Sequence, residues 1–232
     1  MPLIKINDIN LYYEVHGTGE PLVIILGLGS DISDYGYMID YLSKSYKVIV
    51  ADNRGAGRSD KPKTKYSMDQ MADDIISLLD HLKIDQANVL GTSMGGRIAL
   101  SIALNHKKRV KKLILVCTFA SRGYRLRLSL PMKFLYPFRF LPKFRGYPQP
   151  RYAYILQRDA VFDYDVVDRL KEIRLPTLIL HGEKDKTVDF KFAKVLNKNI
   201  KDSKLVAFKG GHLFFIFGER KKFLTTVTTW LK

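Results

Sequence analysis

Val89-Leu90-Gly91-Thr92-Ser93-Met94-Gly95-Gly96-Arg97 places a serine between two glycines, each two residues away. Residues 87–90 before it are apolar apart from Asn88, and residues 97–105 after it are rich in Ala, Leu and Ile at helical spacing. The pattern predicts a strand, a sharp turn with Ser93 at its apex, and a helix. Small residues suit such a turn because strand and helix approach closely there, and the strained backbone lifts the hydroxyl clear of the sheet. A structural turn with a capping serine is the alternative interpretation.

Further strands and helices alternate along the chain. An unbroken apolar run at 21–26 predicts a buried strand, the mainly apolar ranges 47–51, 112–116 and 176–180 predict further buried strands, and a last strand is expected at 204–208. Helices are expected over 34–44, 67–82, 188–199 and 217–231, and the short runs 3–6 and 11–15 predict a hairpin. Continuous apolarity implies burial on both faces, so we expect an α/β fold: a mostly parallel sheet with helices on both faces. In such sheets the chemistry lies at the carboxyl ends of the strands.

Composition limits the class of protein. The 232 residues are enough for one large core, and no linker-like stretch divides them, so we expect one domain with at most an insertion. The net charge of +16 suggests an anionic partner. Cys117 is the only cysteine, which excludes an internal disulfide. With no signal-like start and no run of eighteen apolar residues, we expect a soluble, cytoplasmic protein.

A serine hydroxyl is a poor nucleophile at neutral pH, so a reactive Ser93 needs a general base, and that base needs an acid to hold its tautomer. His212 is the candidate base because the adjacent glycines let its ring reach over the sheet. The other histidines are expected at the surface (His16, His81 and His106) or capping the sheet (His181). For the acid, Asp185 follows a buried strand and is better placed than its competitors Glu183 and Asp189.

Four motifs in register resemble the α/β-hydrolase superfamily, in its esterase and lactonase-like branch, over nearly the whole chain. They are residues 27–29, 52–59, 91–95, and 181–185 together with 211–212. The resemblance implies that Ser93 is the nucleophile, His212 the base and Asp185 the acid. It also implies an oxyanion hole formed by the backbone N–H groups of Leu28 and Met94.

Two positions depart from the family's pattern. The family usually has histidine where Leu26 stands, just before Gly27, so this chain lacks that imidazole next to the expected oxyanion hole. It also often has proline where Asp189 stands, so a second carboxylate lies near Asp185 in the sequence. No cluster of His, Cys, Asp or Glu has ligand spacing, so the sequence predicts no metal and no cofactor.

The segment 121–158 has nine basic residues, no acidic residue, interleaved aromatic residues and several prolines. We expect residues 121–170 to be a short cap or lid between two parts of the core, 1–120 and 171–232. Three roles compete: a plain lid, a clamp on the substrate, or a docking surface for an anionic membrane. Nucleic acid is not an expected partner, since no recognised nucleic-acid fold accompanies the patch.

The expected function is that of a serine hydrolase acting on a small or medium apolar carboxylic ester or lactone, through an acyl-enzyme. One alternative uses the same three residues for carbon–carbon bond hydrolysis or transfer to another acyl acceptor. The other is a non-catalytic ligand-binding member of the fold. The only partner this function requires is the small-molecule substrate.

Overall fold

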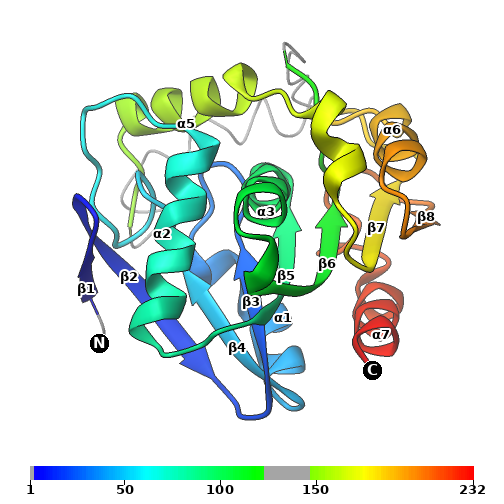
Figure 1. Cartoon of the computed structure of the whole chain (residues 1–232), viewed down its shortest axis with the longest axis horizontal. Helices are drawn as coiled ribbons and strands as arrows, with labels where there is room; N and C mark the ends of the chain where they lie inside the picture. The colour runs from blue at the N-terminus through cyan, green and yellow to red at the C-terminus, as the bar shows by residue number, and fades with distance from the viewer. Residues whose placement is uncertain (1–2, 123–146) are drawn as a thin grey trace.

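The computed structural model describes residues 3–122 and 147–232. Within them, eight strands form one sheet in the order β1-β2-β4-β3-β5-β6-β7-β8 (Figure 1). Pairs β1/β2 and β2/β4 are antiparallel and the other pairs are parallel, which confirms the expected mostly parallel sheet and the N-terminal hairpin. The strands are β1 (Leu3–Ile6), β2 (Ile9–His16), β3 (Glu20–Ile25), β4 (Tyr46–Ala51), β5 (Ala87–Thr92), β6 (Val110–Val116), β7 (Thr177–Gly182) and β8 (Ser203–Phe208).

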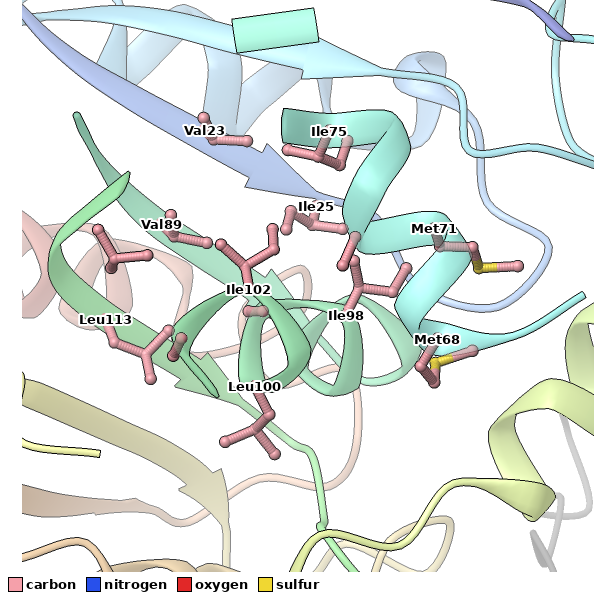
Figure 2. Packing of buried hydrophobic residues seen from close by; sticks show 14 of the residues in the cluster. Val23, Ile25, Met68, Met71, Ile75, Val89, Ile98, Leu100, Ile102 and Leu113 are labelled. Atoms are coloured by element: carbon pink, nitrogen blue, oxygen red, sulfur yellow. The ribbon is translucent and has the colours of Figure 1, made fainter. Parts of the chain in front are cut away.

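Helices cover both faces of this sheet (Figure 1). Apolar residues of α2 (Met68–His81), α3 (Met94–Asn105) and α6 (Lys191–Asn199) belong to one core cluster, and those of α1 (Gly36–Leu42) and α7 (Arg220–Leu231) to the other. In Figure 2, side chains of α2 and α3 such as Ile75, Ile98 and Ile102 face Val23 of β3 and Val89 of β5. The described part also contains α5 (Arg151–Asp163) and the 3₁₀ helices η1 (Ile32–Tyr35), η2 (Lys107–Arg109) and η5 (Val167–Glu172). No helix in the described ranges is long and apolar enough to cross a membrane.

Several helices begin later than the apolar pattern predicts. α6 starts at Lys191 rather than 188, because Val188 O accepts a hydrogen bond from His181 and the Asp189 carboxylate accepts one from Lys191 N. α7 starts at Arg220 rather than 217, after a separate turn in which Phe217 N donates to Leu213 O. The predicted helix 34–44 is divided into η1 and α1. Local hydrogen bonds at the helix starts, made by side chains before α6 and by the backbone before α7, therefore set these boundaries, and the apolar spacing does not reveal them.

Arg97 of α3 is a fully buried cation held by carbonyl groups. Its guanidinium donates to Phe119 O at 2.8 Å, to Ser121 O at 3.3 Å and to Tyr164 O, and it lies 4.0 Å from the centre of the Phe119 ring. In the described part of the chain it forms no ion pair, and burial lowers its pKa to about 10. Phe119 and Ser121 lead out of the core after β6, while Tyr164 leads back after α5. One side chain therefore ties together the entering and leaving stems of the predicted insertion.

The predicted insertion 121–170 is described only at residues 121–122 and 147–170, which include α5 and η5. α5 crosses the end of the sheet toward which the arrowheads of β5, β6 and β7 point (Figure 1). Six of the nine basic residues of the segment 121–158 lie outside the described residues. The lid, clamp and membrane-docking roles all stay predictions.

Candidate active site

Ser93 lies at the junction of β5 and α3 with φ 52° and ψ −113°, a conformation that a non-glycine residue rarely adopts. Close backbone packing surrounds this junction. A Cβ built on Gly91 would lie 2.3 Å from Gly95 O, and one built on Gly95 would lie 2.1 Å from Ile25 O at the end of β3. Glycine is therefore required at both positions by the approach of α3 to the sheet, and the strained turn expected from the sequence is present.

His212 lies beside Ser93, although 119 positions separate them in the chain. Its Nε2 is 3.1 Å from Ser93 Oγ, and its Nδ1 is 2.7 Å from Asp185 Oδ2. Gly182, the last residue of β7, allows this arrangement, since a Cβ there would lie 2.4 Å from Gly210 O in the loop before His212. The structure thus joins Ser93, His212 and Asp185 in one chain of hydrogen bonds.

The Asp185 carboxylate is fully buried and accepts hydrogen bonds on both oxygens. Oδ1 accepts from the backbone N–H groups of Thr187 and Val188, each at 2.8 Å, while Oδ2 faces His212. Burial alone would raise the pKa of this carboxyl, but hydrogen bonds from His181, His212 and Val188 hold it well below its ordinary value. Asp185 therefore stays ionised, as a group that fixes the tautomer of an imidazole must.

The two competing carboxylates lie elsewhere. Asp189 caps the start of α6 through the Lys191 backbone, and its side chain is about half exposed, at 52 %. Glu183 is exposed to solvent. Neither hydrogen bonds to His212 among the described residues, so the extra carboxylate at position 189 does not compete with Asp185 for the histidine.

His181 is closer to this group than its expected role as a sheet cap implies. It is fully buried, and its Nε2 lies 2.8 Å from Val188 O and 3.3 Å from Asp185 Oδ2. Asp185 therefore has an imidazole on either side. His181 closes β7 four residues before Asp185, and this short connection is the signal in the sequence that points to the contact.

Cys117, His181 and Asp185 also form a group whose potential metal-ligand atoms lie within 4.8 Å of one another. The sequence spacing did not predict this group, because its members come from two different strand ends. Both Asp185 oxygens already accept hydrogen bonds, and burial with the nearby Asp185 charge raises the pKa of the Cys117 thiol well above its ordinary value. A protonated thiol and an occupied carboxylate make poor ligands, so the group is better described as the surroundings of Asp185.

Two backbone N–H groups lie next to Ser93. Leu28 follows Gly27, on which a built Cβ would lie 3.7 Å from Ser93 Cβ, and Met94 is the first residue of α3, where an amide has no acceptor within the helix. Among the described residues neither N–H donates to an acceptor. Both amides therefore keep an unused hydrogen-bond donor in the described part of the chain, and their role as an oxyanion hole stays a prediction.

Other side chains fix the loop before Leu28 where the family usually has histidine. Leu26 O accepts from Asn53 Nδ2 at 3.1 Å, and Gly27 N donates to the Tyr35 hydroxyl at 3.1 Å. The Tyr35 hydroxyl in turn hydrogen bonds with Thr92 Oγ1, one residue before Ser93. Leucine at position 26 therefore leaves no gap in the support of this loop.

The low pKa of Asp185 predicts a pH-dependent contribution to stability. A carboxyl whose pKa is lowered by folding stabilises the protein above its unfolded-state value, here about 3.8, and loses that contribution as the pH falls toward the folded-state value. The unfolding free energy of the wild type minus that of Asp185→Asn should therefore shrink below about pH 4, by up to about 1.4 kcal/mol per pH unit. Chemical denaturation of both proteins between pH 7 and pH 3 measures this difference in unfolding free energy. Asp189→Asn is the exposed control, and a wild-type advantage over Asp185→Asn that does not change with pH would contradict the assignment.

Comparisons with known proteins agree on one family. The family model described as alpha/beta hydrolase fold matches residues 20–145. The AB hydrolase superfamily protein YisY of Bacillus subtilis strain 168 is 30% identical over 92% of this chain and 92% of its own length. The 3-oxoadipate enol-lactonase 2 of Acinetobacter baylyi is 29% identical over 89% of this chain and 87% of its own length. The solved esterase EaEST of Exiguobacterium antarcticum superimposes with a TM-score of 0.83 at 32% identity, covering 96% of this chain and 95% of that one.

Proposed function

The chain belongs to the alpha/beta hydrolase family, and from this premise we propose that it is a serine hydrolase cleaving a small or medium apolar carboxylic ester or lactone through an acyl-enzyme. The observation that carries the proposal is the hydrogen-bond chain from Asp185 through His212 to Ser93. A protein that only binds ligands has no physical need for such a chain. The similarity to an esterase and an enol-lactonase supports ester and lactone bonds as the bonds that are cleaved.

In the proposed reaction, Ser93 Oγ attacks the substrate carbonyl while His212 Nε2 takes the hydroxyl proton. Asp185 keeps the other ring nitrogen protonated and stabilises the imidazolium that forms. The carbonyl oxygen becomes an oxyanion and accepts hydrogen bonds from the N–H groups of Leu28 and Met94, each typically contributing about 10²–10³ in rate.

When the tetrahedral intermediate collapses, His212 donates its proton to the departing alkoxide, and an ester of Ser93 remains. In a lactone, the departing alcohol stays attached to the acyl group. Water then attacks the acyl-enzyme with His212 again as base, and collapse of the second intermediate releases the acid and restores the Ser93 hydroxyl.

The proposal predicts that a fluorophosphonate probe adds once to the protein, at Ser93. His212→Ala should slow the addition by at least about 10³, because the hydroxyl then lacks its base. Intact-mass spectrometry over time, followed by peptide mapping, measures both the rate and the position. His106→Ala is the matched control, since His106 also contacts an aspartate, Asp73, but lies away from Ser93. A folded wild-type protein that forms no adduct and hydrolyses no p-nitrophenyl ester of any chain length would refute the proposal.

A further inference from the structure

A buried glutamine from outside the core reaches the loop that holds Leu28. Gln157 lies on α5 and is completely buried. Its Oε1 accepts from Gly29 N at 3.1 Å, across 128 positions of the chain, and its Nε2 donates to Arg54 O at 2.7 Å. A second buried glutamine, Gln149, donates to the same Oε1 at 2.9 Å and to Gly55 O at 2.8 Å.

The loop in question is a β-turn over residues 27–30. Ser30 N donates to Gly27 O at 3.2 Å, and Gly29 has φ +66°, the combination that characterises a type II turn. Types I and II differ by rotation of the middle peptide, here the one that joins Leu28 to Gly29. The N–H of that peptide is the group bonded to Gln157, so this contact favours one of the two turn conformations.

The neighbouring peptides are held by other groups. The peptide of Leu26 and Gly27 is fixed at both ends, by Asn53 and Tyr35, and the carbonyl of the next peptide, Gly27 O, accepts from Ser30. The N–H opposite this last carbonyl is that of Leu28, the proposed oxyanion donor. Gln157 is thus the contribution of α5 to a turn that Asn53, Tyr35 and Ser30 also support.

We propose that Gln157 is a positioning residue for the oxyanion hole: by holding the Gly29 N–H it keeps in one conformation the middle peptide of the turn, which is joined through the Leu28 Cα to the peptide that carries the Leu28 N–H. This inference rests on the proposed function and deepens it. Because α5 lies in the predicted insertion, it also means that part of the support of the hole is supplied by that insertion.

If Gln157 had only a general structural role, its substitution would change stability and kinetics in a different way. If Gln157 only filled space or stabilised the fold, its loss would lower stability without a selective effect on the transition state. If it orients an oxyanion donor, its loss weakens an interaction made only in the transition state, so kcat and kcat/KM fall together while KM changes little.

The test compares Gln157→Leu with Gln149→Leu as the matched control, using p-nitrophenyl ester kinetics and inhibition by an alkyl trifluoromethyl ketone. The ketone forms a tetrahedral adduct with the serine whose oxygen occupies the hole. Both substitutions remove a buried amide from the same hydrogen-bond cluster, but the acceptor for Gly29 N is the side chain of Gln157 and not that of Gln149. For Gln157→Leu we expect kcat to fall and the Ki of the ketone to rise by about 10-fold to 100-fold, with KM within about threefold. For Gln149→Leu, kcat, KM and the Ki of the ketone should all stay within about threefold of the wild-type values.

Gln157→Glu is the conservative variant that guards against misfolding of the leucine variant. Glutamate keeps the oxygen that accepts from Gly29 N, and burial favours its protonated form, whose hydroxyl can donate to Arg54 O, so it should restore most of kcat. Unchanged kcat in folded Gln157→Leu, an equal loss in Gln149→Leu, or a loss in Gln157→Glu as large as in Gln157→Leu would each overturn the inference. An inactive and probe-resistant wild type would instead reject the proposed function itself.

Discussion

Ser93→Ala is expected to lower kcat by about 10⁴ to 10⁶ and to leave the protein folded. The substitution removes only the hydroxyl that lies 3.1 Å from His212 Nε2, and alanine keeps the same Cβ at the strained junction. Residual hydrolysis then depends on the oxyanion donors and on substrate binding, which cannot replace the acyl-enzyme. Steady-state kinetics with a p-nitrophenyl ester, together with thermal unfolding of both proteins, measures the two effects separately.

Ser77→Ala is a suitable control for this variant. Ser77 is a half-buried serine of α2 whose hydroxyl donates to Asn7 at 3.3 Å, so its loss also removes one serine hydrogen bond. It should keep wild-type kcat. Substantial turnover by Ser93→Ala, beyond what contaminating wild-type protein explains, would show that another group is the nucleophile.

Gly95→Ala is expected to destabilise the protein by at least about 3 kcal/mol, or to prevent folding altogether. The added Cβ would lie 2.1 Å from Ile25 O and 2.7 Å from Leu26 O, and both neighbours are backbone atoms that cannot rotate away. Relief requires α3 to move off the end of β3. The same movement would displace Ser93 from the turn that holds Leu28, so activity and stability should fall together.

Gly36→Ala offers a matched comparison, since Gly36 also lies in the first turn of a helix. A Cβ at this position meets nothing within 4 Å, and its φ of −46° suits any residue. Its unfolding free energy should stay the same or rise by about 0.4–1 kcal/mol. Urea denaturation of the two variants measures the contrast. Equal stability of Gly95→Ala and Gly36→Ala would mean that α3 does not pack against β3 as closely as described.

The parts of the fold that depend on apolar patterning follow from the sequence. The buried strands, the hairpin and the turn at Ser93 were all predictable, because continuous apolar runs and closely spaced glycines report burial and close approach directly. The same reasoning predicted that His212 reaches over the sheet, and the structure places it beside Ser93. Helix starts were less predictable, since single side-chain contacts to the backbone decide them.

The polar contacts that support the site were not predictable. Arg97 and Gln157 both bond to backbone groups, and every residue of the chain carries such groups, so no side-chain pattern indicates which ones are used. The bond from Gly29 to Gln157 spans 128 positions and depends on where α5 crosses the sheet. The contact of His181 with Asp185 is different, because its short spacing is visible in the sequence once the loop after β7 is considered.

Arg97 has a consequence for how proteins of this kind diverge. Its guanidinium donates to the carbonyl groups of Phe119 and Ser121 on one stem and of Tyr164 on the other. These bonds hold the two stems together whatever the length of the chain between them. Doubling the length of a flexible connection between fixed ends costs only about 0.6 kcal/mol of closure entropy. Insertions and deletions between the stems therefore cost little free energy of folding, provided that Gln157 keeps its position. The length of chain between the two stems can therefore change while the residues around Ser93 keep their positions.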